Sequence, residues 1–342
     1  MRKLSIALAL GMSVVVLAAQ DTPEAHVATA RSAAGQEYTA LFNQLCPATA
    51  APAQGQAAER GGRGGGGGGG GGGARGAAAP AAATGQRRGT PDPATWHAEP
   101  VKVFDNLYYV GMTEYSAWAV VTSQGIIVID TIYDYSVEDE VVGGLRKLGF
   151  DPASIKYAIV SHAHTDHSGG ARYLQDKFGT RIVLSAPDWD LFESNTPEAA
   201  RPKRDIVATD GYKLTLGDTT LTLHLTPGHT PGTISTIIPV KDQGRPHVVA
   251  EWGGTAFNFT PSAAAFQTYI DSAKRFSDVV TRTGADVIIS NHTNYDGSKT
   301  KQPALATRKA GDPHPYVVGN ESVKRYLKVA EECATARLKA LN

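Results

Sequence analysis

The sequence predicts an α/β protein in which sheets and helices alternate twice along the chain. Short β-branched and aromatic runs, separated by turn residues, predict antiparallel meanders over 103–129 and again over 214–250. Segments with apolar residues at helical spacing follow each meander, and the longest spans 266–280. We therefore expect two halves, each made of a sheet and the helices that cover it.

The composition argues against a nucleic-acid-binding protein. The 342 residues carry 33 basic and 33 acidic side chains, so the formal net charge is zero, and charged residues make up 19% of the chain. A protein without a basic surface has no strong electrostatic attraction for a phosphate backbone. We expect a small-molecule substrate, with no nucleic acid and no protein partner. The length fits one large domain or two ordinary ones.

The first 19 residues, 1–19, are predicted to form a signal peptide. Arg2 and Lys3 precede an apolar run over 4–17 that ends in Ala18-Ala19. This run is too short for a comfortable membrane span and is typical of a secretory signal. No cysteine follows it, and no later stretch is apolar enough to cross a bilayer, so no membrane anchor is expected. We predict cleavage near 18–20 and a periplasmic or secreted mature protein.

The segment 20–46 is predicted to contain a short helix that docks on another part of the protein. Its apolar side chains recur at helical spacing, at Tyr38, Leu41, Phe42 and Leu45. A helix this short is not stable alone in water, so it needs a partner surface.

The Ala- and Gly-rich segment 47–90 is predicted to be a disordered linker. It includes an unbroken glycine run, Gly64–Gly73, which loses much backbone entropy on folding and buries no side chains. A phosphate-binding glycine loop would need a strand before it and a helix after it, and the sequence predicts neither.

The two cysteines, Cys46 and Cys333, are predicted to form a disulfide that joins the two ends of the chain. Export places them in an oxidising compartment, where an even number of cysteines favours pairing. Cys46 closes the short helical pattern, and Cys333 lies on the apolar face of the last predicted helix. The alternative is a pair of buried free thiols.

The remaining residues, 91–342, are predicted to form the main domain, which begins near Trp96. The strands expected in its first half are 103–104, 107–110, 118–122, 126–129, 157–160 and 181–184. A helix is expected to begin at Ser136, with Asp139 three residues on as in a capping box. Its apolar stripe consists of Val137, Val141, Leu145 and Leu148. Shorter helical segments are expected at 171–177 and 189–192.

The second half of the main domain repeats this organisation. The expected strands are 214–216, 219–226, 235–239, 247–250 and 286–290, and the expected helices are 266–280 and 320–333. In the strand 219–226, leucines alternate with threonines and His224, which is typical of a half-buried strand. His224 lies on its polar face, so we interpret this histidine as structural or exposed.

A cluster of metal-capable side chains directly follows the predicted strand 157–160. His162, His164, Asp166 and His167 fall within six residues. A helix cannot present two residues that are two positions apart on one face, whereas a loop leaving a strand can point both His162 and His164 at one ion. Asp166 and His167 come next and can hold a second ion. Zinc favours neutral imidazole and carboxylate ligands, so this pattern predicts a zinc site rather than an exposed polar loop.

Two further histidines follow strands in the same way. His229 lies in a turn defined by Pro227, Gly228, Pro231 and Gly232, and His292 comes directly after the apolar strand 286–290. Taken singly, neither would be notable. Because loops that follow strands carry sites at one edge of a sheet, we expect both histidines to join the zinc site.

These motifs resemble those of the metallo-β-lactamase superfamily. The matching segments are His162-Ala163-His164-Thr165-Asp166-His167, Gly228-His229-Thr230-Pro231-Gly232, the terminal strand with His292, and Val128-Ile129-Asp130-Thr131. The resemblance extends over about 96–296. It implies an αββα four-layer sandwich, with the metal ions in the groove between two β-sheets and 91–342 as the catalytic domain.

Within this superfamily the ligand pattern is most similar to class B, subclass 3. The first ligand is His162 rather than Asn, and neither cysteine lies just after the Gly-His motif. The resemblance implies two Zn²⁺ per chain, one on His162, His164 and His229 and the other on Asp166, His167 and His292. It also implies that Asp130 ties the ligand loops together. Iron or manganese is the alternative, but five histidines and one aspartate in an exported protein favour zinc.

The sequence also departs from its relatives near the expected site. Lactone and thioester hydrolases of the superfamily carry a metal-bridging Asp in the strand that here reads Val248-Val249-Ala250-Glu251-Trp252, and no Asp stands there. Glu251 is one position off. Trp252 stands about where a Ser is expected, and its indole could narrow the pocket.

The resemblance implies a hydrolase in which a hydroxide generated between two zinc ions attacks a carbonyl carbon. Asp166 is expected to bind metal and orient the hydroxide, and Tyr295 is a candidate hydrogen-bond donor to the oxyanion, although packing is its commoner role. The preferred substrate is a cyclic amide, as in β-lactamases. The alternatives are another ester, lactone or thioester, or a non-catalytic metal-binding protein, which a complete ligand set disfavours.

Overall fold

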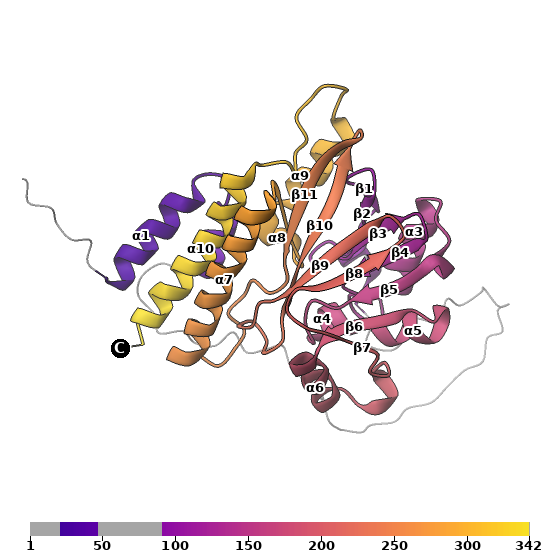
Figure 1. Cartoon of the computed structure of the whole chain (residues 1–342), viewed down its shortest axis with the longest axis horizontal. Coiled ribbons are helices and arrows are strands. Elements are labelled where there is room, and N and C mark those ends of the chain that lie inside the picture. Colours follow the sequence, from indigo (N-terminus) through magenta and orange to yellow (C-terminus); the bar gives the residue numbers. More distant parts are fainter. Residues whose placement is uncertain (1–20, 47–90, 342) are drawn as a thin grey trace, which may run out of the picture.

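The computed structural model describes residues 21–46 and 91–341, which form four layers (Figure 1). A seven-stranded sheet and a five-stranded sheet face each other. Helices α1, α10 and α7 cover the second sheet, and α3, α5 and α6 cover the first. This architecture is the αββα sandwich that the sequence predicts. The predicted signal peptide 1–19 and linker 47–90 lie outside the described residues.

The first sheet contains the first meander and three parallel strands. Its strands in spatial order are β1 Val101–Lys102, β2 Leu107–Tyr109, β3 Trp118–Thr122, β4 Gly125–Ile129, β5 Ile155–Ile159, β6 Arg181–Ser185 and β7 Ile206–Ala208. Strands β1 to β4 pair antiparallel, whereas β4 to β7 pair parallel. The predicted strand 103–104 falls just after β1, and β7 was not predicted.

The second sheet contains the second meander and one parallel strand. Its strands are β8 Tyr212–Leu216, β9 Thr219–Leu225, β10 Ile234–Asp242, β11 Arg245–Trp252 and β12 Val287–Ser290. Strands β8 to β11 pair antiparallel in chain order, and β12 joins β11 in parallel. All five correspond to strands expected from the sequence. The predicted ligands follow the ends of three strands. His162, His164, Asp166 and His167 come after β5, His229 comes after β9, and His292 comes after β12.

Each predicted amphipathic segment falls in a helix, whereas α1, α4, α8 and α9 were not predicted. The helices on the first sheet are the π-helix η2 Glu138–Val142, α3 Gly143–Lys147, α4 Thr165–Ser168, α5 Ala171–Phe178 and α6 Ala186–Asn195. The others are α1 Pro23–Ala34, α2 Thr39–Leu45, α7 Ala263–Thr283, α8 Thr293–Asp296, α9 Ser298–Thr307 and α10 Asn320–Lys339. Single 3₁₀ turns are η1 Pro93–Thr95, η3 Pro152–Ser154 and η4 Glu198–Ala200. Among the described residues, none of these helices has the length and apolar character needed to cross a bilayer.

Each interface between layers has its own hydrophobic core. The two sheets enclose one cluster that includes Trp118, Leu221 and Ile289. A second cluster lies between the first sheet and its helices, and a third lies between the second sheet and α7 and α10. Alternate residues of a strand face opposite cores, so the sheets tie all three clusters together.

The expected capping box at Ser136 is wrong. The Ser136 hydroxyl donates to Met112 Sδ at 3.2 Å and to the Tyr133 carbonyl at 3.3 Å instead of capping a helix. The helical segment starts with the π-helix η2 and continues as α3. Its predicted apolar side chains are nevertheless buried against the first sheet. Tertiary contacts to Met112 therefore outweigh the local capping preference.

The N-terminal segment is anchored on the last helix. Helices α1 and α2 pack against α10, and a disulfide joins Cys46 to Cys333 with 5.0 Å between their Cα atoms. The predicted disulfide is therefore present. Leu41, Phe42 and Leu45 of α2 are buried in the core beneath α7 and α10, which supplies the partner surface that so short a helix needs.

Candidate metal centre

The loop after β5 and the short helix α4 carry the four clustered ligand candidates. His162 and His164 follow β5, and His164 has extended backbone and precedes the first residue of α4. Asp166 and His167 lie within α4, which is a single helical turn rather than the loop expected from the sequence. The rings of His162 and His167 lie 4.3 Å apart between centroids, so this turn holds the second pair beside the first.

His162, His164 and His229 form a first donor triad. His229 Nε2 lies 3.1 Å from His162 Nε2 and 3.1 Å from His164 Nδ1. Three nitrogens bound to one zinc at about 2.0–2.1 Å in tetrahedral directions lie about 3.3 Å apart. The spacing of the three nitrogens therefore fits a zinc ion, and it brings together residues from the two separate sheets.

Hydrogen bonds fix the orientation of the first triad. His162 Nδ1 lies 2.9 Å from the Gly253 carbonyl, and His229 Nδ1 lies 2.6 Å from the Ala256 carbonyl. A carbonyl accepts only, so each Nδ1 carries the proton and each Nε2 is left as a free lone pair. Burial lowers the pKa of His162 well below its ordinary value and that of His229 to about 3. Both imidazoles are therefore neutral, as metal ligation requires.

Asp166, His167 and His292 form a second donor triad beside the first. His167 Nε2 lies 3.1 Å from His292 Nε2 and 3.2 Å from Asp166 Oδ2, and Asp166 Oδ2 lies 3.6 Å from His292 Nε2. The donor atoms of His162, Asp166 and His167 all lie within 4.8 Å of one another, so the two triads adjoin. The structure thus brings together all six side chains that the sequence predicts as ligands.

Charge holds the second triad. Burial lowers the pKa of His167, but the nearby carboxylates of Asp166 and Asp130 raise it more. The net pKa of His167 is about 10. Burial raises the pKa of Asp166, but the charge on His167 lowers it further, to a net value below the ordinary range. A divalent cation held by Asp166, His167 and His292 would supply positive charge beside Asp166 in place of the His167 proton.

Asp130 connects the ends of β4 and β5, as the resemblance implies. Its carboxylate accepts from Ser161 N at 2.7 Å and Ser161 Oγ at 2.9 Å, and it lies 2.8 Å from His167 Nδ1. The contact to His167 places the proton on Nδ1 and frees Nε2 for a metal ion.

Asp188, which the sequence analysis missed, joins the two ligand-bearing turns. Its buried carboxylate accepts from Ala163 N at 2.9 Å, Thr230 Oγ1 at 2.7 Å and Gly232 N at 2.7 Å. Burial raises the pKa of Asp188 above its ordinary value. No sequence signal identified this residue, because it lies on α6 and reaches the site only through the packing of α6 against both turns.

Asn291 is a second residue that the sequence analysis missed. Its side-chain amide donates to the Gly253 carbonyl at 2.6 Å, the same carbonyl that accepts from His162. Its backbone carbonyl accepts from Ser116 N at 2.9 Å. Asn291 therefore couples the ends of β11 and β12 to the first triad. The one feature of the sequence that could have pointed to Asn291 is its position directly before His292.

Tyr295, the candidate oxyanion donor, lies on α8 three residues after His292. The centroids of the two rings are 5.7 Å apart. Tyr295 is half-buried against the core of the helix layer, and burial together with the Asp166 charge raises its pKa to about 12. The phenol is therefore neutral at physiological pH and able to donate a hydrogen bond.

Trp252 and Glu251 do not line the centre. The Trp252 indole donates to the Tyr269 hydroxyl at 3.3 Å and packs on the helix layer, so the expectation that it narrows the pocket is wrong. Glu251, on the opposite face of β11, is buried between the sheets. Burial and the nearby Asp130 carboxylate raise its pKa well above the ordinary value. Burial favours the neutral form of this carboxyl group, and Glu251 belongs to neither donor triad.

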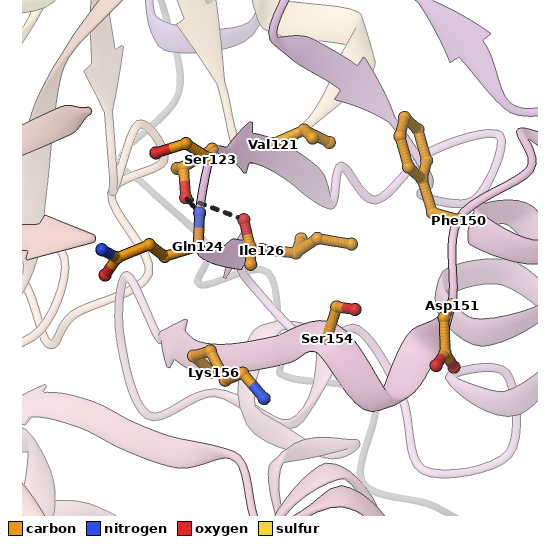
Figure 2. Close-up of a pocket in the computed structure, with 10 residues that line it drawn as sticks. Val121, Ser123, Gln124, Ile126, Phe150, Asp151, Ser154 and Lys156 are labelled. Atoms are coloured by element: carbon orange, nitrogen blue, oxygen red, sulfur yellow. Dashed lines mark hydrogen bonds between the residues drawn. The ribbon is translucent and has the colours of Figure 1, made fainter. Parts of the chain in front are cut away.

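The other histidine considered in the sequence, His224, lies away from the centre. Its ring packs near Phe276 with centroids 6.1 Å apart, and its Nδ1 lies 3.8 Å from Asp210 Oδ1. A cavity of about 490 Å³ is also remote from the ligands, at the opposite ends of β4 and β5 (Figure 2). Its lining includes Phe150, Ser154 and Lys156, none of which is a predicted site residue.

A four-layer sandwich with histidine and aspartate donors gathered at the ends of its strands defines a metal-dependent hydrolase. The family model for the metallo-beta-lactamase superfamily matches residues 111–242. A solved structure of BJP-1, a subclass B3 metallo-beta-lactamase of Bradyrhizobium japonicum, is 31% identical, with a TM-score of 0.59 over 68% of this chain and 91% of that chain. The chain belongs to the metallo-beta-lactamase superfamily.

Other similar proteins include a second metallo-beta-lactamase and two lactonases. The native FEZ-1 metallo-beta-lactamase of Legionella gormanii is 24% identical, with a TM-score of 0.58 over 67% of this chain and 91% of that chain. An N-acyl homoserine lactonase from a Bacillus species is 30% identical over 152 residues, 42% of this chain and 58% of the lactonase. The lactonase AttM of Azorhizobium caulinodans is 27% identical over 52% of this chain and 73% of AttM. The chain thus spans little more than half of the Bacillus lactonase.

Proposed function

We propose that this protein is an exported zinc hydrolase that opens cyclic amides of the β-lactam type. The observation that carries the proposal is the pair of adjoining triads, with histidines alone in the first and no bridging carboxylate at the end of β11. The identity of 31% to a subclass B3 enzyme over most of that enzyme's length supports the same substrate class.

The donor chemistry fits two zinc ions, the first held by His162, His164 and His229 and the second by Asp166, His167 and His292. Zinc in such a centre lowers the pKa of water from about 15.7 toward 7 and polarises a carbonyl. Within the chain, Asp130 keeps the proton of His167 on Nδ1, and the Gly253 and Ala256 carbonyls do the same for His162 and His229.

Two side chains have roles toward the substrate in this proposal. The Asp166 carboxylate orients the attacking water by accepting a hydrogen bond from it. The neutral Tyr295 phenol donates a hydrogen bond to the oxygen of the carbonyl as negative charge develops there. Its raised pKa keeps the phenol proton in place over the working pH range.

Lactone hydrolysis is the second candidate, because the curated relatives with matching sequence are N-acyl homoserine lactonases. Against it, β11 carries Glu251 rather than Asp. The Glu251 side chain is buried between the sheets and belongs to neither donor triad, which weighs against a bridging role. This difference supports a β-lactam rather than a lactone as the substrate.

The decisive experiment compares substrates on zinc-loaded mature protein. A chromogenic cephalosporin and a carbapenem are assayed beside an N-acyl homoserine lactone and a thioester, with His162→Ala as the background control. Turnover of the β-lactams well above the control supports the proposal. Rapid hydrolysis of the lactone or thioester with no β-lactam turnover would establish the alternative.

Export and chain organisation form the remaining part of the proposal. The apolar run over 4–17 is proposed to direct secretion, 47–90 to act as a linker, and 91–342 to be the catalytic domain. The Cys46–Cys333 disulfide is consistent with an oxidising compartment. Mass spectrometry of the mature N-terminus in a periplasmic extract tests this part, and an intact Arg2–Leu4 sequence there would contradict it.

A further inference from the structure

Three tyrosines form a continuous aromatic surface beside the second triad, and no step of the proposed reaction uses them. Tyr115 and Tyr133 meet edge to face with centroids 5.1 Å apart, and Tyr133 and Tyr135 stack at 5.0 Å with an interplanar angle of 15°. All three are half-buried, so part of each side chain remains accessible. Trp96 packs behind Tyr135 at 5.7 Å.

Tyr115 is held directly against the metal-ligand histidines. Its ring centroid lies 5.2 Å from that of His292 and 6.4 Å from that of His167. Backbone pairing fixes this position, because Tyr115 forms an isolated antiparallel bridge with His292. Thr293 N also donates to the Glu114 carbonyl at 3.1 Å. The ring therefore lies at the edge of the proposed reaction site.

Tyr133 reaches the same place through an unusual backbone turn. Asp130 and Ile132 both adopt positive φ, at 61° and 49°, which is rare for any residue with a side chain and most unusual for a β-branched one. The turn is clamped to the ligand-bearing segment, since Thr131 N donates to the His167 carbonyl at 2.8 Å and Gly170 N to the Ile132 carbonyl at 3.0 Å. Strain of this kind persists where function requires a particular geometry.

We propose that Tyr115, Tyr133 and Tyr135 form a tyrosine platform that binds an aromatic ring of the substrate and so determines specificity. This inference rests on the proposed function, because it takes the second triad as one edge of the reaction site. Rigid rings that already stack on one another lose little entropy on binding, and aromatic pairs interact more favourably than their buried area alone provides. An aliphatic chain of equal length gains less from contact with aromatic rings.

The test uses a pair of probes that differ only in the ring. Phenylacetate and acetate share the carboxylate that binds a metal centre, and calorimetric titration of zinc-loaded protein gives their relative affinity. We expect the wild type to bind phenylacetate about tenfold more tightly, as one favourable aromatic contact predicts. Tyr115→Leu and Tyr133→Leu should reduce this ratio to about two or less, whereas Tyr115→Phe should preserve it.

Tyr173→Leu is the matched control, since Tyr173 is a half-buried tyrosine of α5 that packs on Phe178 away from the ligands. It should keep the wild-type ratio. A wild type without preference for phenylacetate would overturn the proposal. So would leucine variants in which both affinities fall together with zinc content, because that result indicates structural support rather than recognition.

Turnover gives a second measurement on the same variants. Two β-lactams with the same ring system, one acylated with phenylacetyl and one with acetyl, report the ratio of kcat/KM values. That ratio should fall about tenfold in Tyr115→Leu and remain at the wild-type value in Tyr173→Leu. If the wild type hydrolyses neither compound but its phenylacetate preference depends on Tyr115, the proposed function fails while the platform is supported.

Discussion

The two donor triads adjoin, but the protein holds them by different means. Neutral backbone carbonyls of Gly253 and Ala256 anchor two imidazoles of the first triad. A charged side chain, Asp130, anchors His167 in the second triad, and the remaining histidine, His292, lies on a segment that the N-terminal part of the chain supports. A carbonyl anchor neither titrates nor changes rotamer. We therefore expect the first triad to be the more robust of the two.

The support of the second triad extends far along the chain. Helix α8 begins directly after His292, and α2 packs against it. Asn294 of α8 donates from its side-chain amide to Gln44 Oε1 at 2.9 Å, across 250 positions of sequence. Because the disulfide fixes Cys46 just beyond α2, the position of His292 depends on contacts that the first triad does not share.

The largest expected effect comes from removing ligands. His162→Ala should reduce hydrolysis to background, because two remaining nitrogens do not complete the first triad. Asp166→Ala or His167→Ala should lose mainly one zinc of the two. Elemental analysis of dialysed protein measures this difference, and a single ion in fully loaded wild type would contradict the two-triad interpretation.

Asp130→Asn should weaken the second triad selectively. The amide keeps the shape but removes the charge that orients His167, so affinity for the second ion should fall about 10–100-fold while the first ion is retained. Competition with a chromophoric chelator measures both affinities. Asp139→Asn, which changes an exposed carboxylate on η2, is the control and should match the wild type. Equal loss of both ions would show that Asp130 supports the whole centre.

Removing the disulfide should mainly lower the stability of the fold, and it should also weaken zinc binding at the second triad. The bond closes a loop of 287 positions, so Cys46→Ser should lower the free energy of unfolding by about 2–5 kcal/mol. Urea unfolding with and without reductant measures this change. Zinc should also dissociate faster from the second triad than from the first. An unfolding midpoint that does not respond to reductant in the wild type would be evidence against this role.

The smallest expected effect is a pH dependence of the stability that His26 of α1 contributes through its contacts with Asp21 and with Glu332 of α10. Burial lowers the pKa of His26, but hydrogen bonds to Asp21 and Glu332 raise it to a net value above 6.5. A raised folded pKa means that this contribution is fully present below pH 6.5 and is lost as the pH rises through the folded value. The difference in melting temperature between wild type and His26→Asn should therefore shrink by about 1–3 °C as the pH rises through the folded pKa. A gap that widens with pH would reverse the assigned sign.

Short-range patterns explain why much of the molecule was predictable. The predicted ligands His162, His164, Asp166 and His167 fall within six residues, so one strand end and one turn suffice to bring them together. The five strands of the second sheet were recognisable because apolar residues alternate or run together between clear turns. Strand β7 escaped recognition because three residues give no periodicity, and β7 forms only by pairing with β6.

The sequence by itself determined the α/β class, the candidate ligand set and the pairing of its two cysteines, because local patterns, an even cysteine count and the resemblance to a known superfamily carry those properties. Only the tertiary structure decided that Trp252 faces the helix layer, that Asp188 joins two ligand turns, and that Tyr115 lies against His292. The first depends on which face of β11 packs against the helix layer. The other two depend on contacts between segments more than 20 positions apart in the sequence. Such choices follow from the packing of whole layers, which no local pattern encodes.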